Sequence, residues 1–72
     1  MKKKKILVAG GTGLLGSSLT TLLSKNKKFL LTSSYLTGKP IKNLKKNYKR
    51  YDFLKYDDCL RATKNKDVVI VS

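Results

Sequence analysis

The sequence has a single cysteine, Cys59, and no long apolar run, and both scarcities limit where the protein works. One cysteine excludes a disulfide within the chain, and a reducing cytoplasm is then the simplest compartment. No apolar stretch approaches the roughly 20 residues of a membrane-spanning helix. The lysines at residues 2–5 precede an apolar run, as in a signal peptide, but glycines interrupt that run after four residues. We therefore expect a cytoplasmic protein that does not enter a membrane.

Acidic residues are also scarce. The chain has four aspartates, no glutamate and no histidine, against 17 lysines and arginines, which gives a net charge of +13. This balance suits binding to nucleic acid or to an anionic membrane surface. All the basic residues except Arg50 and Arg61 are lysines, however, whereas base recognition and bidentate phosphate contacts favour arginine. A lysine-rich proteome with AT-biased codons explains the composition equally well. A non-catalytic basic module that binds nucleic acid stays an alternative function.

The most informative stretch is a short apolar run followed by a glycine-rich turn. Residues 6–9 read as a strand buried on both faces, and an apolar pattern with helical spacing begins at Leu14. Four glycines fall within the seven residues that follow the apolar run: Gly10, Gly11, Gly13 and Gly16. Glycine lets the backbone approach a ligand closely, and the helix that follows presents free N–H groups to an anion. The order strand, glycine turn and helix predicts a phosphate-binding unit.

The glycine spacing narrows this prediction to a dinucleotide. Gly11, Gly13 and Gly16 match G-x-G-x-x-G, and Gly10 with the last two matches G-x-x-G-x-x-G. In such patterns the first glycine makes the tight turn, the second admits the pyrophosphate and the third lets helix and strand pack closely. A nucleoside-triphosphate loop would need a lysine after Gly16, where this chain has Ser17. A glycine turn that binds nothing is the structural alternative.

Two blocks of the chain resemble one family. Residues 10–16, GGTGLLG, and residues 52–71 are similar to the extended short-chain dehydrogenase/reductase family, which contains the NAD(P)-dependent epimerases, dehydratases and reductases of nucleotide sugars. Residues 35–40 and 57–63 resemble its GDP-fucose synthase-like members. Family members are several times longer, so the resemblance implies that residues 1–72 are the N-terminal part of an NAD(P)-binding Rossmann domain. A sugar-nucleotide substrate is implied only for a full-length relative.

The rest of the chain predicts alternating strands and helices. We expect strands at residues 5–9, 29–34, 48–53 and 67–72, a helix at 14–25, and a short helix with Asp57 as its N-cap. An irregular crossover with at most one helical turn should fill residues 35–47. The core-facing side chains are predicted to be Leu14, Leu15, Leu19, Leu22 and Leu23 of the first helix and Leu60 and Ala62 of the second. The expected fold is α/β, a partial Rossmann-type parallel sheet with strand order 3-2-1-4, truncated after the fourth strand.

The end of the second strand bears on the choice of coenzyme. An acid at that position would bind the ribose 2′-hydroxyl of NAD, but Ser33 and Ser34 stand there instead. Without the carboxylate, their hydroxyls and nearby Lys39 are candidates to hold the 2′-phosphate of NADP. We therefore expect NADP or NAD as cofactor, with a slight preference for NADP. From the family resemblance, Asp52 would bind the adenine amine and Phe53 would pack on the ring, unless Asp52 only turns the chain.

The predicted site contains no catalytic and no metal-binding residue. The cofactor-binding residues are Gly10, Gly11, Thr12, Gly13, Leu14, Leu15, Gly16, Ser33, Ser34, Asp52 and Phe53. The family's catalytic Tyr-x-x-x-Lys lies beyond its fourth strand; the matches at Tyr35 with Lys39 and Tyr51 with Lys55 are expected by chance in so lysine-rich a chain. The leading hypothesis is therefore that the chain binds a dinucleotide but lacks the catalytic part of the enzyme family. A non-functional truncated gene product is a further alternative.

Overall fold

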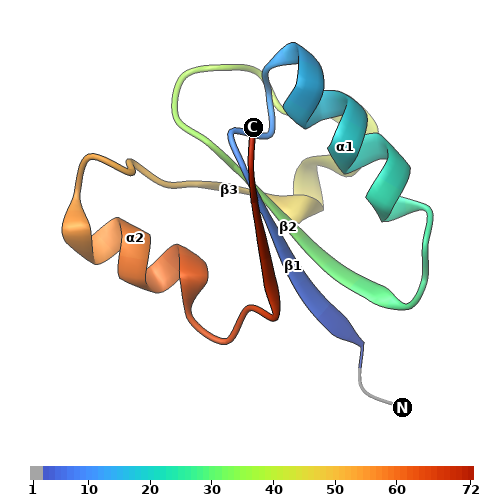
Figure 1. Cartoon of the computed structure of the whole chain (residues 1–72). Helices are drawn as coiled ribbons and strands as arrows, with labels where there is room; N and C mark the ends of the chain where they lie inside the picture. Colours follow the sequence, from blue (N-terminus) through green and yellow to red (C-terminus); the bar gives the residue numbers. More distant parts are fainter. Residues whose placement is uncertain (1–2) are drawn as a thin grey trace.

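A computed structural model describes residues 3–72 as an α/β arrangement around one parallel sheet (Figure 1). The sheet has four strands in the order β3-β2-β1-β4, as the sequence predicts. The elements in chain order are β1 (Lys4–Ala9), α1 (Leu14–Ser24), β2 (Phe29–Tyr35), the 3₁₀ helix η1 (Lys42–Asn47), β3 (Tyr48–Arg50), α2 (Tyr56–Thr63) and β4 (Val68–Val71). No helix within residues 3–72 is long and apolar enough to span a membrane.

The two α-helices lie on opposite faces of the sheet (Figure 1). The connection through α1 leads from β1 to its neighbour β2, whereas the connection through α2 leads back from β3 to β4 at the other edge. Crossovers between parallel strands are right-handed, so that connections running in opposite directions carry their helices to opposite faces. Because all the strands are parallel, their carboxyl ends lie together along one side of the sheet, which we call its carboxyl edge. The turn after β1 lies at this carboxyl edge.

β1 is the buried centre of the molecule, as its apolar run predicts. Ile6 and Val8 face α1 and form the core with Leu31 of β2. Leu7 points to the other face, because side chains alternate along a strand, and it is fully buried as well. Pairing on both sides fixes the position of β1, with Ile6 opposite Leu31 of β2 and Val68 of β4.

The face of α1 that packs on the sheet differs from the predicted leucine stripe. Gly16 and Thr20 are the buried residues of the helix, and Leu23 packs against the core. These positions recur at i, i+4 and i+7, and the small side chains of Gly16 and Thr20 bring the helix close to the strands. Leu14, by contrast, is 91% exposed, and Leu15 and Leu22 are also exposed. The prediction that these three leucines face the core is wrong, because the close approach at Gly16 turns them away from the sheet.

The third strand is shorter than predicted and the crossover before it is more helical. β3 ends at Arg50 instead of residue 53, because the Asp52 carbonyl and carboxylate accept hydrogen bonds from the backbone N–H groups of Lys55 (2.9 Å) and Leu54 (3.0 Å). These bonds turn the chain into the loop before α2. The crossover forms two short 3₁₀ turns within η1, joined by a kink at Leu44, instead of a single turn near residues 41–44.

α2 begins before the residue predicted to cap it. Lys55 occupies the N-cap position and Asp57 lies inside the first turn, so the N-cap prediction for Asp57 is wrong. A carboxylate there still favours the helix, because it faces the positive end of the dipole. Ala62 is the buried residue of α2, as predicted, whereas Leu60 is half exposed and does not point inward as expected.

Candidate functional site

The glycine turn after β1 is held by hydrogen bonds from three neighbouring strands. Gly10 has a φ of +84°, which only glycine adopts without strain, and its N–H donates to Ser34 Oγ at 3.0 Å. The Gly11 N–H donates to the Ser34 carbonyl at 2.7 Å, and the Tyr48 hydroxyl donates to the Gly11 carbonyl at 2.6 Å. On the far side, the Ser72 hydroxyl donates to the Gly10 carbonyl at 2.8 Å. The turn is therefore fixed by the ends of β2 and β4 and the start of β3.

Gly16 joins the first helix to this turn. A Cβ added there would lie 2.9 Å from the carbonyl carbon of Gly10 and would overlap its oxygen. Real Cβ atoms do not approach backbone so closely, so that the helix can sit on the turn only with glycine at this position. This is the close helix–strand packing that the pattern predicts for its third glycine.

Gly13 has the opposite environment. It is the N-cap of α1, it is exposed, and a Cβ added there meets no atom within 4 Å. No side chain caps the helix at this end, so the first N–H groups of α1 have no partner from the cap residue. The backbone at Gly13 thus borders open space beside the positive end of a helix dipole, which is a suitable place for an anion.

The three predicted site residues that stand between the glycines, Thr12, Leu14 and Leu15, differ in exposure. Thr12 is half buried beneath the loop after β2, and a Cβ on Gly38 would collide with its side chain. Leu14 and Leu15, in the first turn of α1, are exposed to solvent.

The predicted serines are part of the scaffold instead of a phosphate contact. Ser33 is fully buried, with its Oγ 2.7 Å from Thr20 Oγ1, and it links β2 to α1. Ser34 is almost fully buried and its Oγ accepts the Gly10 N–H. Burial and existing hydrogen bonds leave neither hydroxyl at the surface, so the expectation that Ser33 and Ser34 hold a 2′-phosphate does not fit this geometry.

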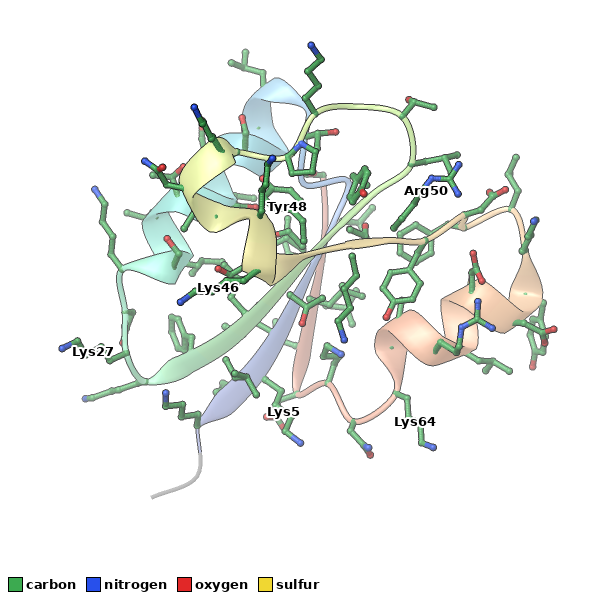
Figure 2. All side chains as sticks on the ribbon, turned by 180° about the vertical axis from the view of Figure 1, so that it is seen from behind. Lys5, Lys27, Lys46, Tyr48, Arg50 and Lys64 are labelled. Carbon is green, nitrogen blue, oxygen red and sulfur yellow. The ribbon has the colours of Figure 1, made fainter. Side chains whose placement is uncertain are left out.

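Arg50, the last residue of β3, lies beside the end of β2 and was not among the predicted site residues. Tyr35 pairs with Arg50 across β2 and β3, and Arg50 Nε donates to the carbonyl of Leu36 at 3.2 Å. Figure 2 shows the exposed Arg50 side chain reaching from β3 to the loop that follows β2. No local signal reveals this arrangement, since it depends on the register of two strands joined by a long crossover.

A pocket of about 300 Å³ opens beside the turn at the same edge of the sheet. Four predicted cofactor residues line it, namely Gly10, Ser34, Asp52 and Phe53, and they come from three separate segments of the chain. The remaining lining residues are Tyr35, Leu36, Tyr51 and Leu54, so the walls are mostly apolar and aromatic. The rings of Tyr51 and Phe53 lie 6.3 Å apart between centroids.

Asp52 both bonds the backbone of the turn before α2 and lines the pocket. Its Oδ1 accepts the N–H of Leu54 at 3.0 Å, which is the turn-forming role considered as the alternative. The hydrogen bonds formed within residues 3–72 use only this one carboxylate oxygen of Asp52. The other oxygen therefore stays available at the wall of the pocket.

The two tyrosine–lysine matches lack the geometry needed for proton transfer. Tyr35 ends β2 while Lys39 lies in the loop, and Tyr51 follows β3 while Lys55 is the N-cap of α2. A helix would bring such side chains together one turn apart, but neither pair lies on one. In the part of the chain that the structure describes, no three His, Cys, Asp or Glu residues are grouped as metal ligands.

Comparison of the chain with models of protein families, with curated proteins and with solved structures finds no match.

Proposed function

We propose that the chain binds the dinucleotide NAD(P) across the carboxyl edge of its sheet, as the N-terminal part of a Rossmann-type domain. The observation that carries the proposal is the contrast between two glycines of one motif. A Cβ on Gly16 overlaps backbone, whereas a Cβ on Gly13 meets nothing. Folding thus requires glycine at residue 16 and has no steric need for it at residue 13. Gly13 is also a favourable N-cap residue, and a ligand that must touch the backbone there is a further reason for a glycine.

The pyrophosphate fits the space above Gly13. The first N–H groups of α1 lack a side-chain cap, and the helix dipole favours a negative charge at this end. No residue of the first turn of α1 is acidic, so nothing repels the phosphates. Gly10 and Gly11 donate their N–H groups to Ser34, so they shape the turn and leave anion binding to the N–H groups at the start of α1.

The adenine fits the neighbouring pocket. Its walls combine aromatic and apolar side chains with the carboxylate of Asp52, a suitable acceptor for the exocyclic amine. The exposed ring of Phe53 offers a stacking surface for the base. Gly10 borders both the pocket and the turn, so a single extended ligand can occupy both places.

Arg50 favours NADP over NAD as the ligand. An arginine near the end of the second strand accommodates a 2′-phosphate, and no carboxylate lies in residues 29–36 to repel one. The Nε of Arg50 is bonded to Leu36, which holds the guanidinium at the strand end, and the hydrogen bonds formed within residues 3–72 use no other N–H group of this side chain. Arg50 thus takes the role that the sequence analysis gave to Ser33 and Ser34.

Membership of the extended short-chain dehydrogenase/reductase family belongs to the same proposal. A bound nicotinamide cofactor supplies hydride transfer, and this chain's residues would bind and orient it. Proton transfer to a sugar-nucleotide substrate needs a positioned acid or base, and neither Tyr35 nor Tyr51 is placed beside a lysine on a helix. In a full-length relative that group would come from outside residues 1–72.

The experiment is a calorimetric titration of NADPH into the chain and into Gly13→Val. The branched side chain would fill the space of the pyrophosphate, so binding should be lost. The valine also replaces a favourable N-cap residue, which costs about 1 kcal/mol of stability, so circular dichroism must show that the variant is folded. Thr21→Val, on the exposed side of α1, is the matched control and should bind normally. Equal affinities for Gly13→Val and the unmodified chain would refute the proposed site.

A further inference from the structure

A second pocket, of about 690 Å³, lies at the opposite edge of the sheet, where the strands begin. Its lining residues are Lys3, Lys4, Lys5, Leu30, Asn65, Lys66 and Asp67. Figure 2 shows Lys5 at this end of the sheet and Arg50 at the other. The pocket is therefore separate from the proposed dinucleotide site, and nothing in that function requires it.

Three lysines from distant parts of the chain converge on one face beside this pocket. Lys5 pairs with Leu30, and Lys49 pairs with Ser34. Leu30 and Ser34 lie an even number of residues apart on β2, so Lys5 and Lys49 point to the same face of the sheet. Lys66, in the turn between α2 and β4, is half buried there. Its pKa is lowered from the ordinary value of 10.5 by partial burial and then by the charges of Lys49 and Lys5.

No ion pair formed within residues 3–72 involves these lysines, and a single carboxylate lies at the pocket. The ion pair formed within these residues joins Arg61 to Asp58. Asp67 is the acidic residue at the pocket, and its Oδ2 accepts the backbone N–H of Lys5 at 2.7 Å. Four lysines against one aspartate leave the lining with an excess of three positive charges. Such crowding of like charges destabilises the fold unless an anion offsets it.

We propose that this pocket binds a chain of linked phosphate groups. Several ammonium groups lining a volume of about 690 Å³ suit more than one phosphate at once. Lysine acts as a point charge toward phosphate and does not read bases, and no aromatic side chain lines the pocket to stack on one. The ligand is therefore recognised by its phosphates alone. Inorganic polyphosphate and the backbone of a single-stranded nucleic acid both present this chemistry.

Two double variants that remove the same number of charges distinguish a specific phosphate site from the general attraction of anions to a chain with a net charge of +13. Lys5→Gln with Lys66→Gln removes two charges of the pocket lining. Lys42→Gln with Lys46→Gln removes two exposed charges from η1, which Figure 2 shows through Lys46 away from Lys5. Each protein is titrated by calorimetry with sodium tripolyphosphate and with a short oligothymidylate over a range of salt concentrations.

We expect the first variant to lose most of its affinity and the η1 variant to keep it. For single-stranded nucleic acid, the salt dependence should weaken by about 1.4 in the slope of log K against log salt, since each neutralised phosphate contributes about 0.7. Binding of tripolyphosphate alone would identify free polyphosphate as the ligand, and binding of the oligonucleotide alone a nucleic-acid backbone. Equal losses in both variants, or no binding of either probe, would overturn the proposal.

A stability measurement gives an independent outcome. Removing Lys66 relieves repulsion, so Lys66→Gln should melt at a higher temperature than the unmodified chain without ligand. Tripolyphosphate should raise the melting temperature of the unmodified chain through linkage, and of Lys66→Gln much less. A variant that melts lower, or that tripolyphosphate stabilises as strongly, would show that the lysines are not crowded around an anion site.

Discussion

Substitution of Gly16 by alanine tests how the first helix is seated on the turn. By helix propensity alone the change should stabilise the protein, since alanine in a helix interior is better than glycine by about 1 kcal/mol. The structure predicts the opposite, because the new Cβ would lie 2.9 Å from the Gly10 carbonyl carbon and overlap its oxygen. Forcing a methyl group into a closed contact costs about 1–3 kcal/mol, and backbone neighbours place this case at the upper end.

The expected net loss of stability is about 2 kcal/mol after the propensity gain is subtracted. For a domain of this size that corresponds to a fall of roughly 8–16 °C in melting temperature. Thermal unfolding followed by far-ultraviolet circular dichroism measures it, with Gly13→Ala as control because its Cβ meets no atom within 4 Å. The control should lose at most about 1 kcal/mol, through the weaker N-cap. A Gly16→Ala protein as stable as the unmodified chain would refute the packing argument.

Two further substitutions test the support of the turn and the coenzyme preference. Tyr48→Phe removes the hydrogen bond to the Gly11 carbonyl and should cost about 1 kcal/mol in urea unfolding, with no change in m value; an unchanged midpoint would show that this bond does not hold the turn. Arg50→Gln should weaken NADPH binding about fivefold, because the lost contact is charged but exposed, and should leave NADH binding unchanged. Equal losses for both coenzymes would show that Arg50 does not contact the 2′-phosphate.

Local pattern was sufficient for the elements and their order. Residues 6–16 contain the apolar run of β1, the spaced glycines and the start of the helix in one contiguous stretch. The conformation of this stretch could therefore be predicted from its sequence. Because crossovers between parallel strands are right-handed, few strand orders are possible, and the order 3-2-1-4 could be predicted. The buried position of β1 was predictable for the same reason, since both of its faces are apolar.

Contacts between distant segments were not predictable from pattern. The leucine spacing of α1 indicated a core face, but the close approach at Gly16 selects a different one, with Thr20 buried against Ser33. Polar hydroxyls at the end of β2 suggested ligand contacts, whereas in the fold Ser34 accepts the Gly10 N–H and Ser33 bonds the Thr20 side chain. Arg50 reaches the end of β2 only through the register of β2 and β3. Each of these outcomes depends on geometry that a single stretch of sequence does not contain.

The central claim is that a dinucleotide binds at the carboxyl edge of the sheet, and a residue-resolved NMR titration of the backbone amides with NADPH tests it most directly. The account predicts the largest shifts at the amides of Gly10–Gly16 and of Asp52 and Phe53, with small shifts at Lys5 and Lys66 on the opposite edge. Shifts concentrated at Lys5 and Lys66 would mean that NADPH binds only through its phosphates to the lysine pocket. That result, or the absence of any shift at the glycine turn, would contradict the account.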